Sequence, residues 1–179
     1  MNSKFLVSLL AAMICAASCK QKVHTTHVEK AFYYWQNLPY NFHEKEIECL
    51  YKDSIQKLYV KFFEVEPHEI LGNIPVAKSE LHIQGSFYGN DTIYTNTIQN
   101  LSIVPSIYMR NTVFFNVSNV DLDTLADNIL FLTNKYFKEK YPSIVKPFSE
   151  IQIDCDWTPA TQEKYFYFLK QLKKLSGKT

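Results

Sequence analysis

The residues best suited to chemistry in this sequence are two aspartates, Asp154 and Asp156, which stand two positions apart in a short apolar run. Because side chains alternate along a strand, both carboxylates would lie on one face together with Gln152. The opposite face would be apolar and would pack under helices: Ile151, Ile153 and Cys155. Two positions along a strand span ~7 Å, which is close enough for one carboxylate to raise the pKa of the other in a dry site. Such a pair suits general acid and base roles in glycoside cleavage.

A structural role for the same carboxylates is the alternative hypothesis. Lys61 lies in another strand-like run, with Tyr59 and Phe63 on the same face. An inward Asp154–Lys61 ion pair would satisfy a buried charge without any catalysis, because charges in a protein interior need partners. We expect this structural role at least for Asp154, the deeper of the two aspartates, and catalysis by the pair stays open.

Three aromatic residues are candidates for contacts with a substrate. Tyr33, Trp35 and Trp157 lie at the ends of expected strands. Rings beside carboxylates would suit a sugar-binding cleft, in which Lys61 would be a further polar contact. Core packing explains the tyrosines equally well, so Trp157, which directly precedes a helix start, is the strongest of the three.

Strand-like and helix-like segments alternate along the chain and would position these residues. The expected strands cover residues 31–35, 57–65, 101–108 and 150–157, and the expected helices cover 43–52, 122–140 and the segment after Thr158. Strands separated by helical crossovers predict a parallel sheet whose units wind the same way. The predicted fold class is therefore α/β, with four parallel βα units forming about half of a TIM-type (β/α)8 barrel. Asp154 and Asp156 would then lie near the C-terminal end of a strand, where barrel active sites are built.

Local signals add detail to this architecture. Residues 81–87 and 92–97 flank Gly89-Asn90-Asp91 and predict a small β-hairpin insertion. Asp121 is the expected N-cap of the long helix. Thr158 is the expected N-cap of the last helix, with Pro159 at its first position. An apolar stripe would bury this helix: Tyr165, Phe168, Leu169, Leu172 and Leu175.

Residues 1–18 have the three parts of a lipoprotein signal peptide. Lys4 supplies a positive charge, residues 5–14 form a short apolar core, and Ala16-Ala17-Ser18 precede Cys19. The apolar run is far shorter than the ~20 residues that span a bilayer. We therefore expect lipidation of Cys19, a tether over residues 19–30, and one domain over residues 31–179. The lipid would hold the protein in the cell envelope, on the outer membrane or on the periplasmic face of the inner membrane.

Charge and cysteine content restrict the expected partners. The 19 basic and 18 acidic residues give a net charge of +1, so no nucleic-acid partner is expected. His24 and His27 are expected to be solvated parts of the tether, and no Cys/His spacing indicates a metal site, so we predict neither metal nor cofactor. Cys49 and Cys155 are expected to be two buried free thiols, with a disulfide as the alternative.

Three segments carry a resemblance to a known family: residues 31–35, 57–65 and 150–158. They resemble the N-terminal half of a family of uncharacterised Bacteroidetes lipoproteins, which are longer chains with a glycoside-hydrolase-like barrel. The resemblance covers most of the mature chain, and the run from Ile153 to Thr158 is its most specific element. It implies that this chain is a truncated half barrel.

The last expected strand also resembles the fourth strand of family 18 chitinases, which carries an Asp-x-Asp-x-Glu pattern. Asp154 and Asp156 match the two aspartates, and the glutamate that acts as the acid would fall on Thr158. Because a threonine cannot serve as the general acid, the resemblance does not carry chitinase activity to this chain.

Three functional hypotheses from different classes remain. The first is a lipid-anchored, truncated glycoside-hydrolase-like barrel without activity of its own. The second is a carbohydrate-active hydrolase that uses Asp154 and Asp156, and the third is a non-enzymatic envelope binding or assembly module. We rank the first highest, because four βα units leave two open sheet edges that must be covered or paired. The expected partners are the membrane, through the N-terminal lipid, a carbohydrate ligand, and a homodimer partner or another protein over those edges.

Overall fold

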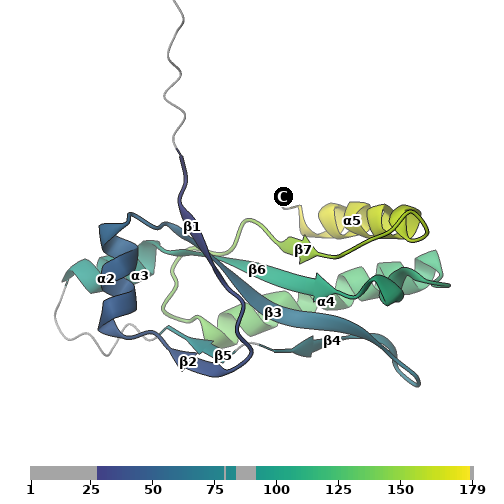
Figure 1. Cartoon of the computed structure of the whole chain (residues 1–179), viewed down its shortest axis with the longest axis horizontal. Coiled ribbons are helices and arrows are strands. Elements are labelled where there is room, and N and C mark those ends of the chain that lie inside the picture. The colour runs from purple at the N-terminus through teal and green to yellow at the C-terminus, as the bar shows by residue number, and fades with distance from the viewer. Residues whose placement is uncertain (1–27, 79, 84–91, 178–179) are drawn as a thin grey trace, which may run out of the picture.

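The computed structural model describes residues 28–78, 80–83 and 92–177. The predicted signal peptide, the lipidation site Cys19, and the tether histidines His24 and His27 lie outside the described residues. The described chain forms a five-stranded sheet, a small two-stranded sheet and helices packed around them (Figure 1).

The main sheet contains parallel strands in the order of the chain: β1 (Ala31–Tyr34), β3 (Lys57–His68), β6 (Ser102–Met109) and β7 (Gln152–Asp154). The sheet curls, so that these strands form a half-barrel (Figure 1). A further strand, β4 (Gly72–Ala77), folds back antiparallel onto the C-terminal half of β3. The prediction of an α/β fold built on a parallel sheet is therefore confirmed.

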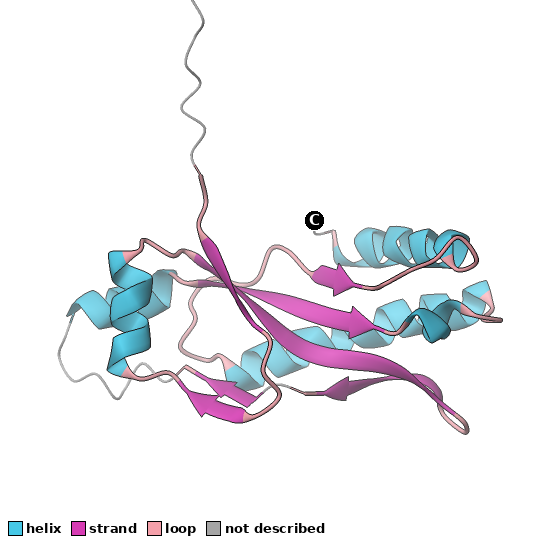
Figure 2. Ribbon diagram, viewed as in Figure 1, coloured by secondary structure: helices cyan, strands magenta, loops and turns pink. Residues whose placement is uncertain are grey.

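The remaining elements surround this sheet: β2 (Pro39–Asn41), α2 (Glu44–Lys52), β5 (Glu80–His82), α3 (Thr92–Asn100), the 3-10 turn η2 (Asn111–Phe114), α4 (Asn119–Lys140) and α5 (Gln162–Ser176). Helices α2 and α3 lie together at the end of the sheet where β3 and β6 begin (Figure 2). Helix α4 runs behind β3 and β6 and packs against α5, which lies beside β7 (Figure 2). Strands β2 and β5 pair in parallel as the second sheet.

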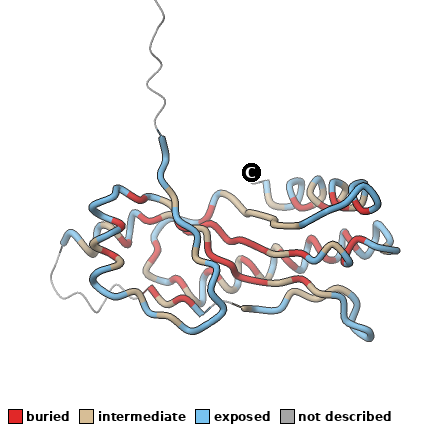
Figure 3. The backbone as a smooth tube through the Cα atoms, in the orientation of Figure 1, coloured by how far each residue is buried: buried red, intermediate tan, exposed pale blue. Residues whose placement is uncertain are grey.

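The core lies between one face of the main sheet and helices α4 and α5. Buried positions follow β3 and β6 and the facing sides of the helices (Figure 3). Val60 and Ile107 on the strands, and Ile129 and Phe168 on the helices, have no exposed surface. Burying such side chains stabilises the fold by about 1.5–3 kcal/mol each, so this face explains why the strands are rich in branched residues. The other face of the sheet is left for polar groups.

A β-bulge interrupts β3 between Lys61 and Phe63. The bulge adds one residue to β3 relative to β6, so that Phe62 and Phe63 are both buried on the helix-facing side, where each ring contacts Tyr136 of α4. Side-chain alternation resumes one residue out of phase after a bulge. Glu64 therefore lies on the same face as Lys61. The prediction that Phe63 shares the face of Lys61 is wrong for this reason.

The predicted hairpin between residues 81–87 and 92–97 is also wrong in its second arm. Residues from Thr92 to Asn100 form helix α3, and β5 ends at His82, while residues 84–91 lie outside the described part of the chain. The helix places Tyr94 and Ile98, four residues apart, against the core. This helical spacing of apolar side chains outweighs the β-propensity of the threonines and isoleucines. The antiparallel pair in this part of the fold is β3 with β4.

Two helix caps differ from the prediction. Ser118, not Asp121, caps α4, because the Ser118 Oγ accepts the Asp121 N–H at 3.1 Å and donates to the Asp121 carboxylate at 2.7 Å. Helix α5 begins at Gln162 with Thr161 before it, because residues from Thr158 form a turn closed by the Thr161 N–H to the Thr158 carbonyl. Strand β7 is likewise shorter than the predicted segment 150–157.

The two cysteines of the described chain are free thiols, as predicted, but neither is fully buried. Cys49 is exposed on α2, where its Sγ donates to the Asp53 carboxylate at 3.3 Å, and this bond, with partial burial, raises the pKa of the thiol. Cys155 is half-buried, and burial followed by the charges of Asp156 and Asp154 raises its pKa to about 11. Both thiols are therefore protonated at neutral pH and poor nucleophiles.

Candidate functional site

The face of the main sheet that points away from α4 collects the polar residues of neighbouring strands. We call it the polar face, and its residues are Tyr33, Trp35, Lys57, Tyr59, Lys61, Glu64, Ser106, Tyr108, Gln152 and Asp154. Strand register arranges them in rows: Lys61 lies opposite Ser106, which lies opposite Gln152. In the next row Tyr108 lies between Glu64 and Asp154. The sequence-based assignment of Gln152 and Asp154 to one face, and of Ile151, Ile153 and Cys155 to the core side, is confirmed.

Lys61 is buried on the polar face and forms an ion pair with Glu64. The prediction that Asp154 is the partner of Lys61 is wrong. Asp154 lies on β7, two strands away from Lys61 on β3, and in the row of Glu64. Burial by itself would raise the pKa of Glu64, but the hydrogen bond from Lys61 and the charge of Lys78, 3.5 Å away, lower it overall. The Glu66 carboxylate forms an ion pair with the Arg110 guanidinium at 3.2 Å, which extends this group of charged residues.

A second ionic cluster lies where the strands begin. The Lys57 Nζ lies 2.8 Å from Glu29 and 2.9 Å from Glu150, and these two bonds raise the pKa of the lysine. The Tyr59 hydroxyl donates to Glu150 at 2.8 Å, and burial together with this bond raises the pKa of Tyr59 to about 12. Burial opposes ionisation of Glu150, yet the bonds from Lys57 and Tyr59 lower its pKa overall. Lys57, Tyr59 and Glu150 are therefore fixed in their usual charge states.

Two buried polar atoms between these clusters have no hydrogen-bond partner among the residues that the structure describes. They are the Ser106 Oγ and the Gln152 Oε1, which belong to the row that starts at Lys61. The Asp154 side chain, half-buried in the next row, forms no hydrogen bond or ion pair within the structure as described. Because buried polar groups are nearly always satisfied, the row of Ser106 and Gln152 is where an ordered water would find unused hydrogen-bonding capacity.

Three of the predicted substrate-binding residues lie together on the polar face. The Lys61 Nζ lies 5.4 Å from the centre of the Trp35 ring, within the range of a cation–π contact. Tyr33 stacks on Tyr59, with the ring centres 4.6 Å apart. The Tyr33 and Trp35 side chains remain 60% and 37% exposed, so both rings are open to solvent.

Trp157 lies apart from this group. Its ring stacks on Tyr165 at 6.3 Å and contacts Phe166 at 5.6 Å, both on helix α5. Trp157 is 41% exposed and therefore lies at a rim, as predicted, but this rim belongs to α5. Its role in substrate binding stays a prediction.

Asp154 and Asp156 do not form a pair held by one strand. Strand β7 ends at Asp154, and Asp156 is exposed in the following loop. The carboxyl groups of the described residues whose pKa departs from the ordinary value all shift downward: Glu46, Glu64 and Glu150. A general acid for glycoside cleavage requires the opposite shift.

Thr158, the position of the acid in the chitinase pattern, belongs to a network of hydroxyl and amide groups. The fully buried Thr161 Oγ1 accepts the Thr158 N–H at 3.0 Å and contacts the Asn111 side chain. The network ties the loop after β7 to η2, which follows β6. Its function in the described structure is to hold these two loops together.

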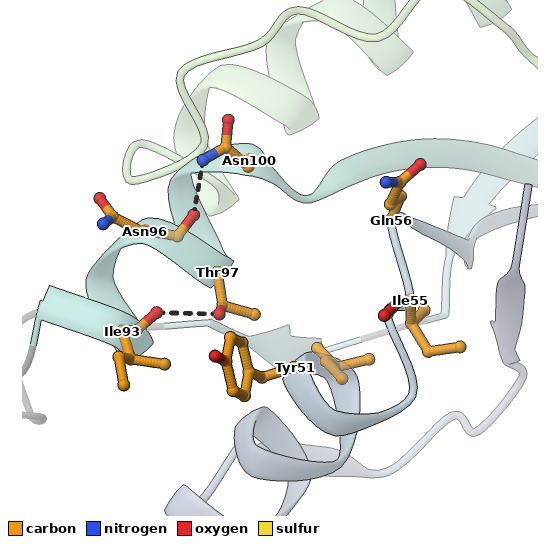
Figure 4. A pocket seen from close by; sticks show the side chains of 9 residues that line it. Tyr51, Ile55, Gln56, Ile93, Asn96, Thr97 and Asn100 are labelled. Atoms are coloured by element: carbon orange, nitrogen blue, oxygen red, sulfur yellow. Dashed lines mark hydrogen bonds between the residues drawn. The ribbon is translucent and has the colours of Figure 1, made fainter.

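A groove between helices α2 and α3 was not predicted from the sequence (Figure 4). Its volume is about 470 Å³, and its lining residues are Leu50, Tyr51, Ser54, Ile55, Gln56, Ile93, Asn96, Thr97 and Asn100. The assignment of residues 92–97 to a hairpin arm hid this groove, because only a helix brings Ile93, Asn96, Thr97 and Asn100 onto one face. The helical spacing of Tyr94 and Ile98 was the signal that could have revealed it.

Comparison with known proteins gives no match: no protein-family model, no curated protein and no solved structure matches the chain. Within residues 28–78, 80–83 and 92–177, no helix has the length and apolar character needed to cross a bilayer. The same residues contain no group of three or more His, Cys, Asp or Glu side chains arranged to hold a metal ion.

Proposed function

We propose that this protein is a lipid-anchored component of the cell envelope whose TIM-type half-barrel binds a ligand without hydrolysing it. The lipobox that ends at Cys19 supports the anchor. The curled parallel sheet and the resemblance to lipoproteins with a glycoside-hydrolase-like barrel support the half-barrel origin.

One observation carries the proposal: the two glutamates that lie among the polar-face residues, Glu64 on β3 and Glu150 just before β7, are held in ion pairs. Glu64 pairs with Lys61 and Glu150 pairs with Lys57, and both carboxyl groups have a lowered pKa. A carboxylate in this state cannot donate a proton to a leaving group near neutral pH. The exposed rings of Tyr33 and Trp35 still offer contacts to a ligand.

Hydrolysis by Asp154 and Asp156 is the second candidate function. The observation that favours it is the Asp154 carboxylate, which is half-buried at the carboxyl end of β7 and has no partner in the described structure. Barrel enzymes place their catalytic groups at this end of the strands. This candidate function lacks a proton donor at position 158, where the chain has a threonine.

The two functions differ in turnover. We expect the mature chain, residues 19–179, to release no reducing sugar from a panel of neutral and charged oligosaccharides. Asp154→Asn and Asp156→Asn, which preserve side-chain size, should then leave this absence of turnover unchanged. Hydrolysis by the wild type that Asp156→Asn lowers by orders of magnitude, with an unchanged melting temperature, would establish the enzyme and end the binding proposal.

A further inference from the structure

The α2–α3 groove is lined by uncharged side chains. None of its nine lining residues is Asp, Glu, Lys, Arg or His. This composition contrasts with the polar face, where lysines and glutamates form ion pairs. A charged ligand would lose its hydration in the groove and gain no opposite charge there, so the groove favours a neutral ligand.

The groove also has an apolar surface with one open aromatic ring. Tyr51 lies on α2 and its side chain is 55% exposed, beside Thr97 of α3 (Figure 4). Ile55 is a buried residue of the lining, and Ile93 contributes an apolar side chain from α3. An exposed tyrosine offers a flat apolar face and a polar edge to one ligand.

Amide side chains supply hydrogen-bonding groups that the protein leaves unused. The Gln56 and Asn96 side chains have no partner within the described structure. Asn100 donates its Nδ2 to the Asn96 carbonyl at 2.9 Å, which leaves its Oδ1 as an acceptor (Figure 4). Each side-chain amide offers two donors and an acceptor, which match neighbouring hydroxyl groups that both donate and accept.

We propose that the α2–α3 groove is a binding site for a neutral oligosaccharide, with Tyr51 stacking on a sugar ring and Gln56 and Asn96 bonding its hydroxyls. The proposal rests on the proposed ligand-binding function, names its ligand class, and places the ligand in this groove and not on the polar face. The volume of about 470 Å³ lies in the usual range of ligand sites, roughly 300–1,000 Å³. The groove lies at the end of the sheet nearest the predicted tether, because the Gln56 N–H bonds the Lys30 carbonyl at 3.2 Å.

Calorimetric titration of the mature chain with maltohexaose, cellohexaose, xylohexaose and polygalacturonate tests this site. We expect at least one neutral hexaose to bind and polygalacturonate not to bind. Tyr51→Ala and Asn96→Ala should each weaken binding about tenfold or more, because each removes a contact central to the site. Phe131→Ala and Asn128→Ala are the matched controls, an exposed aromatic residue and an exposed asparagine on α4, and should leave affinity unchanged.

Several results would overturn the inference. One is the absence of binding by all three neutral hexaoses at about 1 mM, the weak end of specific affinity. Another is binding that Tyr33→Ala abolishes and Tyr51→Ala leaves intact, which would place the ligand on the polar face and leave the proposed function standing. Stronger binding of polygalacturonate than of any neutral hexaose would also refute it. Failure of the proposed function itself would be seen as sugar release in the same samples.

Discussion

At the scale of single residues, the pairing of charges decides what the polar face can do. Lys61 is buried, and its charge is tolerable only because Glu64 lies beside it. The sequence allowed the prediction that Lys61 is an inward cation with a carboxylate partner, and this part is confirmed. The identity of the partner could not be predicted, because it depends on the bulge at Phe62 and Phe63, which no residue pattern marks.

Glu64→Gln should destabilise the fold by about 3 kcal/mol, the scale of a broken buried ion pair, because Lys61 would keep its charge and lose its closest partner. Thermal and urea unfolding of wild type and variant measure the change. The matched control is Glu48→Gln, which removes an exposed pair with Lys52 on α2 and should cost no more than about 0.5 kcal/mol. The double variant Lys61→Met/Glu64→Leu should recover most of the lost stability. A Glu64→Gln protein as stable as wild type would contradict the pairing.

The same glutamate makes the free energy of unfolding depend on pH in the acidic range. The pKa of Glu64 is lowered in the folded state. The contribution of Glu64 to the free energy of unfolding is therefore complete above the pKa of a glutamate in the unfolded chain, about 4.3. The contribution is lost as the pH falls through the lower, folded pKa. The melting temperature of wild type should therefore drop more steeply below about pH 4.3 than that of Glu64→Gln. Parallel curves for the two proteins would mean that Glu64 is not coupled to folding.

At the scale of elements, the strands and long helices were predictable and the connections were not. Strands β1, β3 and β6 and helices α2 and α4 follow the expected segments, because apolar periodicity specifies which face is buried. Strand β4 and helix α3 were missed, because residues 72–77 and 92–100 carry turn formers and β-branched residues whose structure depends on tertiary packing. The loops that follow β6 and β7 are likewise fixed by contacts far apart in sequence.

The Thr161 hydroxyl joins these two loops, and its removal gives an element-scale prediction. Thr161→Val keeps the shape of the buried side chain but leaves the Thr158 N–H and the Asn111 side chain without this partner. We expect a loss of about 1–3 kcal/mol in the free energy of unfolding, the cost of unsatisfied buried groups. Thr124→Val removes an exposed hydroxyl bond on α4 and is the control, with an effect within about 0.5 kcal/mol. Equal stability of the two variants would mean that the network does not hold the loops together.

At the scale of the whole molecule, the half-barrel has strand edges that other parts of the fold cover only in part. Strand β4 covers the side of β3 that extends beyond β1, which the sequence did not predict. The outer edges of β1 and β7 have no strand partner among the described residues. Phe32 on β1 is 45% exposed, so apolar surface accompanies the unpaired backbone. The predicted need for a partner over the edges therefore remains, and it is now confined to short segments.

We expect the mature chain to self-associate through the β1 edge, because exposed strand edges with apolar side chains pair with other strands. Light scattering over a range of concentrations should give a mass that rises above that of the monomer. Phe32→Lys should shift this association to about tenfold higher concentration or more, because a charge on an edge strand must be desolvated when another strand pairs. Phe131→Lys is the control, since Phe131 is 65% exposed on α4, away from the edge, and its replacement should leave association unchanged.

A monomer at all concentrations would mean that short edges and the curl of the sheet suffice to prevent pairing. Equal effects of the two lysines would indicate that general surface hydrophobicity, and not the strand edge, drives association.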